Sequence, residues 1–364
     1  MKKVAQDRED AWRKKVKVSH ANLVLFLRQL SILLASGVPL HMSIDTLSNQ
    51  PEDPQFGRAI EEIGVKIAQG YTLSGVFAWF PRLFSPIHVA LITTGERTGN
   101  LADSLGKLAD WGDREGQLIG KVRAAFTYPI IVFVVACLLT IILFLTVIPG
   151  FVEMFEEKGM ELPLLTRIVV WITHAVTNPG FWLAFIGVAL LLVFSIRDFY
   201  RRPHGARMIH GTLHTIPLVG DILILSGTAR YAAVLGTLLD SGMDLLVSLQ
   251  LAGRASGDPI MEYDSERLVA RIRDGESMTA AMNEKPDIYL STVRQMLTAG
   301  EESSNLSSMC ARLAAFYEDE VAYRVEALGA ALEPLMLVFV SVLVGSIVLA
   351  IILPLYGFLN QLGL

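Results

Sequence analysis

Hydrophobic and polar positions follow a helical period in two long segments of the chain, and three further segments are almost purely apolar. In the first periodic segment, apolar side chains recur at the i, i+3, i+4, i+7 spacing of one buried helix face: Leu23, Phe26, Leu27, Leu30, Leu33 and Leu34. Further helices are predicted at residues 40–48, 55–69, 85–94 and 101–121. Because no run alternates convincingly as a half-buried strand would, the pattern predicts an all-α protein built from helical bundles.

The three apolar runs lack Asp, Glu, Lys and Arg, and each approaches the length of a membrane-spanning helix, which needs about 20 apolar residues. We predict transmembrane helices at residues 125–149, 179–196 and 334–359. The middle helix is slightly short, because the sequence Asn-Pro-Gly at 178–180 interrupts its run. Composition agrees, since 52% of the residues are hydrophobic and only 18% are charged. We therefore expect an integral membrane protein with three spans.

Cations divide unevenly among the polar segments. Of the 31 Lys and Arg residues, 16 precede the first span, 2 lie between the first and second spans, and 13 lie between the second and third. Cation-rich segments stay in the cytoplasm, and the N-terminal stretch lacks the apolar core of a secretory signal. The predicted cytoplasmic segments are a tail at 1–18, a helical domain at 19–123, a linker with an interfacial helix at 197–225 and a second helical domain at 226–332. The predicted periplasmic segments are the connection at 150–178 and the tail at 360–364.

An internal repeat relates the two helical domains at a constant offset of 205 residues, without gaps. Leu30, Ser36 and Gly37 recur as Leu235, Ser241 and Gly242, and the register continues until Pro129 and Pro149 match Pro334 and Pro354. The repeat thus includes the first and third spans. The unpaired middle span returns the second copy to the cytoplasm, so repeat and topology agree.

The same repeat carries a polar motif, GERTGNL at 95–101 and GEESSNL at 300–306. Its candidate partner-binding or structural residues are Gly95, Glu96, Gly99, Asn100, Gly300, Glu301 and Asn305. Two interpretations stay open: the glutamates contact a partner or an occasional cation, or they cap helix ends while the asparagines serve as N-caps. Gly37 and Gly242 follow apolar helical runs and are interpreted as structural turns in the left-handed conformation.

Together, the paired Ser-Gly turns, the repeated GE motif and the proline-bounded apolar runs resemble the type II secretion system F-domain family over nearly the whole chain. These are inner-membrane platform proteins of type II secretion and type IV pilus machines. The resemblance implies a homo-oligomeric subunit of the bacterial inner membrane, and the distribution of cations predicts a cytoplasmic N-terminus and a periplasmic C-terminus. Its implied partners are a cytoplasmic hexameric ATPase, a pilin or pseudopilin, other inner-membrane assembly proteins and membrane lipid.

Motifs for chemistry are missing from the sequence. It contains no phosphate loop G(x)4GK(S/T) and no protease or nucleotide fingerprint, so we predict no catalytic residue and no cofactor, and therefore not an enzyme. A formal net charge of −5 excludes the basic footprint of a nucleic-acid binder. A transporter or channel subunit and a membrane enzyme remain alternatives, although a transporter is expected to carry polar residues within several spans.

Two smaller features have both a functional and a structural interpretation. His210 and His214 are spaced i, i+4, but the sequence offers no evident third ligand, so an interfacial amphipathic helix is preferred and no metal site is predicted. Glu333, directly before Pro334, is a candidate membrane-interface contact for a positively charged group of a pilin. The alternative for Glu333 is a solvated residue at a helix boundary.

Overall fold

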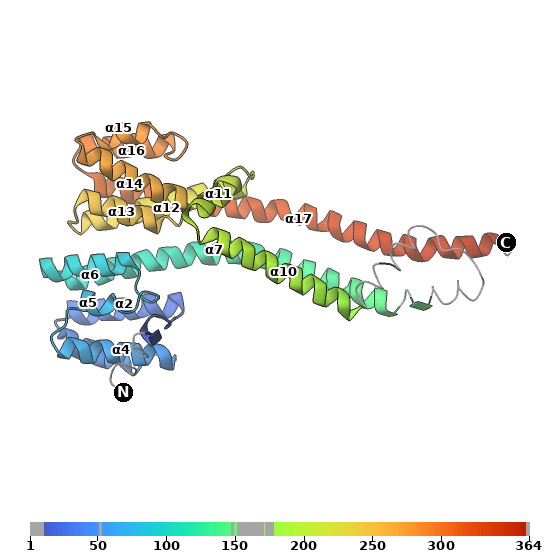
Figure 1. The fold of residues 1–364 in the computed structure, drawn as a ribbon, viewed down its shortest axis with the longest axis horizontal. Coiled ribbons are helices and arrows are strands. Elements are labelled where there is room, and N and C mark those ends of the chain that lie inside the picture. The colour runs from blue at the N-terminus through green and yellow to red at the C-terminus, as the bar shows by residue number, and fades with distance from the viewer. Residues whose placement is uncertain (1–10, 51–52, 147–148, 151–170, 172–177, 362–364) are drawn as a thin grey trace. The chain divides into compact units, whose positions relative to one another are not determined.

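The computed structural model describes residues 11–50, 53–146, 149–150, 171 and 178–361, and these residues form helices and turns without a strand (Figure 1). The prediction of an all-α fold is confirmed. Most of the predicted connection at 150–178, the first ten residues of the predicted tail at 1–18 and the last three residues of the chain lie outside the described residues. The remaining part of the C-terminal tail belongs to a helix that ends at Gln361.

The chain divides into two compact units. The first, here called the helical unit, comprises residues 1–120 and 207–323, and the second, the apolar unit, comprises residues 121–206 and 324–364. The helical unit holds both copies of the repeat up to the predicted membrane entry. The apolar unit holds the three predicted spans.

Each copy of the repeat forms a module of short helices that leads into one long helix. The first module contains α2 (His20–Ala35), α3 (Leu40–Ser48), α4 (Pro54–Ala68), α5 (Leu73–Phe77), α6 (Pro86–Thr98) and the start of α7 (Leu101–Thr146). The second contains α12 (Val219–Asp240), α13 (Leu245–Ala255), α14 (Pro259–Arg273), α15 (Met278–Asn283), α16 (Ser291–Glu302) and the start of α17 (Leu306–Gln361). From α3 and α13 onward, corresponding helices begin 205 residues apart, so the sequence repeat is also a structural repeat.

Helix starts in the two modules follow the same local chemistry. Asp53 caps α4 by accepting a hydrogen bond from the backbone N–H of Gln55 at 2.8 Å, and proline occupies the first helical position. Asp258 caps α14 in the same way, with 2.9 Å to the N–H of Ile260. A side-chain oxygen satisfies an otherwise unpaired N–H, and the proline has none to satisfy.

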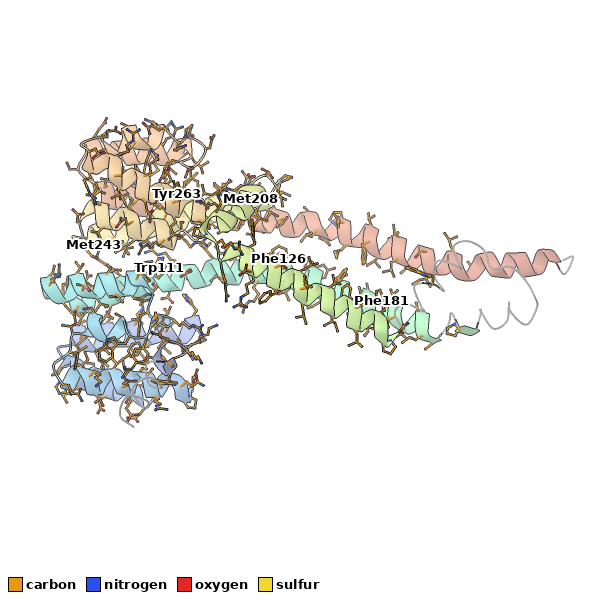
Figure 2. All side chains as sticks on the ribbon, viewed as in Figure 1. Trp111, Phe126, Phe181, Met208, Met243 and Tyr263 are labelled. Atoms are coloured by element: carbon orange, nitrogen blue, oxygen red, sulfur yellow. The ribbon has the colours of Figure 1, made fainter. Side chains whose placement is uncertain are left out.

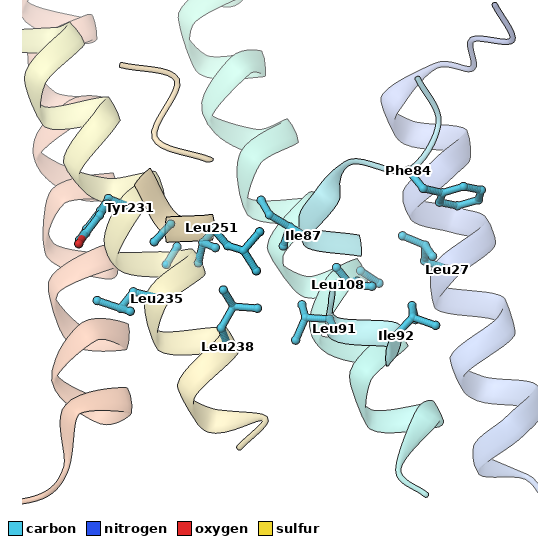
Figure 3. Packing of buried hydrophobic residues seen from close by; sticks show 14 of the residues in the cluster. Leu27, Phe84, Ile87, Leu91, Ile92, Leu108, Tyr231, Leu235, Leu238 and Leu251 are labelled. Carbon is cyan, nitrogen blue, oxygen red and sulfur yellow. The ribbon is translucent and has the colours of Figure 1, made fainter. Parts of the chain in front are cut away.

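Apolar side chains from both modules form one buried cluster (Figure 3). Ile87 and Leu91 of α6 belong to it together with Leu238 of α12 and Leu251 of α13. At the edge of this packing, Lys107 Nζ lies 2.6 Å from Asp240 Oδ2 and 3.0 Å from Asp103 Oδ2. Burial opposes the charge of Lys107, but the two carboxylates raise its pKa above the ordinary value.

The long helices α7 and α17 run without interruption past Pro129 and Pro334. The sequence interpretation had placed a boundary between a helix at 101–121 and a span at 125–149, and the structure has one helix instead. A proline removes one backbone donor without having to end a helix, because neighbouring groups in a membrane bundle can satisfy the freed carbonyl. The middle predicted span is α10 (Pro179–Tyr200), which starts where Asn178 Oδ1 accepts from the N–H of Gly180.

Among the described residues, four helices are long and apolar enough to cross a membrane: α7, α10, α12 and α17. In the most apolar 18-residue stretch of each helix, 61% of the residues are buried in α12, 11% in α7, 6% in α17 and none in α10. Apolar side chains of α10, such as Phe181, project away from the helix (Figure 2). Burial therefore favours α12 as a core helix of the second module, and the assignment of three spans stays a prediction.

Candidate functional sites

The Glu96 carboxylate binds the start of a neighbouring helix in the first module. It accepts hydrogen bonds from the backbone N–H groups of Leu73 at 2.6 Å and Ser74 at 3.3 Å, and from the Ser74 hydroxyl. These groups form the first turn of α5, where N–H groups lack helical partners and the helix dipole favours an anion. Glu96 therefore caps α5, although it lies on α6.

Glu301 repeats this arrangement in the second module. Its carboxylate accepts from the backbone N–H groups of Met278 at 3.1 Å and Thr279 at 3.2 Å, and from the Thr279 hydroxyl at 2.7 Å. These residues open α15. One of the two sequence interpretations has each glutamate cap a helix end close to it in the chain. The helix starts that the glutamates cap lie 22 and 23 residues earlier in the sequence. The spacing of residues along the chain does not indicate such a contact.

The motif glycines stand where helices cross closely. A Cβ on Gly95 would lie 2.5 Å from Ser104 Oγ, and a Cβ on Gly300 would lie 3.2 Å from both the Leu306 backbone and the Met309 side chain. Glycine at these positions lets α6 approach α7 and lets α16 approach α17. This close approach is a structural use of the motif that needs no partner.

Asn100 and Asn305 lie directly before the first residues of α7 and α17. Their backbone N–H groups donate to the carbonyls of Gly95 and Gly300, each at 2.9 Å. Before Asn100, Gly99 ends α6 in the left-handed conformation with φ of 73°. The two asparagines thus follow tight turns at equivalent places in the modules.

The remaining predicted residues lie apart from this motif. Gly37 and Gly242 follow α2 and α12 with φ of 84° and 80°, a conformation that glycine adopts without steric cost. Glu333 is exposed on α17 within the apolar unit. Because α17 continues past Pro334, Glu333 does not stand at a helix boundary, which corrects that interpretation.

A cluster of two histidines and one aspartate joins α11 (Pro203–His214) to the start of α14. His214 Nε2 lies 3.3 Å from Asp258 Oδ2, and His210 Nδ1 lies 3.7 Å from Asp258 Oδ1. The side chains are 18%, 12% and 9% exposed for His214, His210 and Asp258. The sequence interpretation found the histidine pair but missed Asp258, because it lies on a different helix and far along the chain.

Electrostatics at this cluster favour the neutral form of His210. Burial lowers the pKa of His210, and His214 and Arg230 act in the same direction, while Asp258 opposes them. Helix α11 also contacts α14 through Arg207, whose guanidinium carbon lies 4.1 Å from the ring centre of Tyr263. Figure 2 labels Tyr263 on α14 and Met208 on α11, and Met208 is exposed. One face of α11 therefore packs on the second module.

Comparison with known proteins gives two matches to one family. A profile described as type II secretion system (T2SS), protein F, matches residues 26–149 and 231–354, which repeats the offset of 205 residues. A type IV pilus assembly protein PilC from Thermus thermophilus is 32% identical, over 94% of this chain and 84% of its own length. A PilC from Pseudomonas aeruginosa is 29% identical, over 95% and 92% respectively. A type II secretion system protein F from the same species is 30% identical, over 95% and 84%.

Proposed function

The chain belongs to the type II secretion system protein F family, and we propose that it couples a cytoplasmic hexameric ATPase to the assembly of pilin or pseudopilin subunits. It is an inner-membrane platform protein of a type IV pilus or type II secretion machine. As such it is a structural subunit and not an enzyme. The observation that carries the proposal is the repeated family match, which covers most of each module, all of α7 and most of α17.

Exposed apolar surface supports the membrane location. Helix α10 has no buried residue along its 22 residues, and large apolar side chains of α7 and α17 are exposed in their uncharged stretches. Water would make such surface costly, whereas lipid accepts it. The uneven distribution of cations supports modules in the cytoplasm and a C-terminus in the periplasm.

Mechanical coupling is supported by the way each module continues into a long helix. Helices α7 and α17 each begin beside the GE motif and extend into an apolar stretch without a break. A movement imposed on a module by the ATPase would act directly on the helix that enters the bilayer. Homo-oligomerisation would place several such helices around the site where pilin leaves the membrane.

Deletion of the gene in its native host tests the platform role. We expect loss of surface pili or of secreted substrates while pilin remains in the inner membrane, with restoration by the plasmid-borne wild-type gene. Normal assembly and secretion in a strain without a paralogue would refute the role. An alkaline phosphatase fused after Leu364 should be active and one fused after residue 225 inactive, because the enzyme is active only in the periplasm.

Contact with the ATPase can be tested at equivalent positions of the two modules. Met42 on α3 and Val247 on α13 are exposed by 53% and 45% and are related by the repeat. A photo-crosslinking residue at each position should capture the ATPase from at least one module. The matched control is Trp171, which is exposed and predicted to be periplasmic. Capture from neither module, or equal capture from position 171, would reject the coupling proposal.

A further inference from the structure

We propose that His210, His214 and Asp258 form a binding site for a divalent transition-metal ion, with Zn²⁺ as the ion that fits best. This inference goes beyond the platform role and does not depend on it. It starts from the three potential ligand atoms, which all lie within 4.8 Å of one another and come from two separate helices.

The spacing fits tetrahedral coordination. With metal–ligand distances of roughly 2.0 to 2.2 Å, two ligand atoms on the same Zn²⁺ are about 3.3 to 3.5 Å apart. The separations from Asp258 are 3.3 Å to His214 Nε2 and 3.7 Å to His210 Nδ1. Small side-chain rotations would therefore bring all three atoms onto one ion. A water molecule would complete the fourth position.

His214 Nε2 is buried and makes no hydrogen bond within the part of the chain that the structure describes. A buried polar atom without a hydrogen bond is costly, and a metal ion would satisfy it. Asp258 is prepared for the same role, because its Oδ1 accepts the capping hydrogen bond from Ile260 and its Oδ2 faces His214. The helix cap thus fixes the orientation of the carboxylate.

The ligand set selects the class of ion. Two imidazole nitrogens and one carboxylate oxygen suit Zn²⁺ and related late transition metals, whereas Ca²⁺ and Mg²⁺ prefer all-oxygen sites. The Arg230 guanidinium lies near this site and lowers the affinity for a cation. Its Nε donates to the Ser256 carbonyl at 2.7 Å, and the charge of Glu115 partly offsets that of Arg230.

A bound ion would fasten α11 to the start of α14. Helix α11 follows α10 in the chain after Arg201 and Arg202, so the site would hold the first helix after the second predicted span on the second module. The repeat shows that the first module lacks this site. Asp53 is the N-cap equivalent to Asp258, but Ala5 and Glu9 occupy the positions equivalent to His210 and His214. Only the second copy therefore carries this set of residues.

The test uses the full chain, purified in detergent without a polyhistidine tag and stripped with a chelator. Zn²⁺ titration calorimetry and elemental analysis should give one ion per chain, and Co²⁺ should give the visible absorption of a tetrahedral site. His214→Gln, His210→Gln and Asp258→Asn should each weaken Zn²⁺ binding at least about tenfold. Asp258→Asn retains a good N-cap, so α14 should stay folded.

Two matched controls separate this site from general effects. His204→Gln removes another histidine of α11, and Asp53→Asn alters the equivalent N-cap in the first module; both should bind Zn²⁺ like the wild type. Hydrogen exchange in α11 should slow when Zn²⁺ is added to the wild type and not when it is added to His214→Gln. Absence of stoichiometric binding by the wild type, or unchanged binding by His214→Gln or Asp258→Asn, would overturn the proposal.

Discussion

The Glu96 carboxylate lies 2.6 Å from the backbone nitrogen of Leu73, the first residue of α5. Glu301 has the equivalent relation to Met278 at 3.1 Å, so each module uses one glutamate to hold its shortest helix against the helix that precedes the long one. A five- or six-residue helix is too short to be stable alone. The glutamates therefore contribute to the shape of the modules whether or not they also contact a partner.

Replacing either glutamate by alanine should lower the stability of its own module by about 1 to 2 kcal/mol, because two backbone N–H groups and one hydroxyl lose their acceptor. Hydrogen exchange of the full chain should accelerate in α5 for Glu96→Ala and in α15 for Glu301→Ala. Glu302→Ala changes an exposed neighbour and should leave both helices unaffected. Unchanged exchange combined with lost pilus assembly would instead support a direct partner contact.

Local patterns in the sequence predicted a large part of this fold. The leucine spacing of α2 and the proline starts of α4, α6 and α14 depend on residues within one or two turns, so the helices were predictable. The repeat at an offset of 205 residues then related the modules to each other. The joining of the predicted helix at 101–121 and the predicted span at 125–149 into the single helix α7 was not predicted, because the charged pattern ends at Arg123 and a uniformly apolar run follows it.

The contacts that define the candidate sites were beyond the sequence for a different reason. Glu96 meets α5 and His214 meets Asp258 only after separate helices have packed together. A single sequence records residue types and their spacing along the chain, but it does not record which helix faces meet. Repeat symmetry could have indicated part of the answer, because Glu96 and Glu301 recur together with the hydroxyl residues Ser74 and Thr279.

Ser304 provides a test of the turn that precedes α17. Its φ is 54°, whereas the equivalent residue in the first module is Gly99 with φ of 73°. A left-handed conformation costs a non-glycine residue about 1 to 2 kcal/mol, part of which the more flexible unfolded state of glycine offsets. Ser304→Gly should therefore stabilise the second module by roughly 0.5 to 1 kcal/mol. The assay is denaturant unfolding monitored by hydrogen exchange, in which the reciprocal Gly99→Ser should destabilise the first module. Wild-type stability in both variants would contradict this account.

Gly329 provides a test of the packing of α7 against α17 within the apolar unit. A Cβ there would lie 3.6 Å from Ala125 Cβ, and further along the helices the Phe133 and Phe339 rings are 5.4 Å apart. Small residues let membrane helices approach closely, so Gly329→Leu should push the helices apart at a cost of about 1 to 3 kcal/mol. Gly345→Leu is the matched control, since a Cβ at that position would contact no other part of the described chain within 4 Å.

The separation can be measured with cysteines at positions 133 and 339 in a background in which Cys137 is alanine. Oxidation followed by cleavage at a protease site inserted in the 150–178 connection leaves one cross-linked product when the helices are close. We expect less of this product in Gly329→Leu and an unchanged amount in Gly345→Leu. An equal yield in all three chains would exclude the close approach at Gly329.

We expect the buried His88 to make the first module sensitive to acid. Burial lowers the pKa of His88 to about 4, and the nearby His20 acts in the same direction. His88 Nδ1 lies 2.7 Å from the Ser85 hydroxyl, and the cavity beside it is also lined by Arg82 and Glu115. In the unfolded chain His88 takes up a proton near pH 6.5, so between about pH 6.5 and 4 the unfolded state binds more protons than the folded state.

The free energy of unfolding should therefore fall by up to about 3 kcal/mol because of His88 as the pH drops from 6.5 to 4. Above pH 6.5, where His88 is neutral in both the folded and the unfolded chain, this loss should be absent. Urea unfolding of the full chain across pH 4 to 7.5, with hydrogen exchange in α6 as the local readout, would measure it. His88→Gln should flatten the dependence in this range even if it lowers stability overall. His41→Gln, which changes an exposed histidine of the same module, should retain the wild-type slope. A wild-type slope in His88→Gln would show that other groups cause the acid sensitivity.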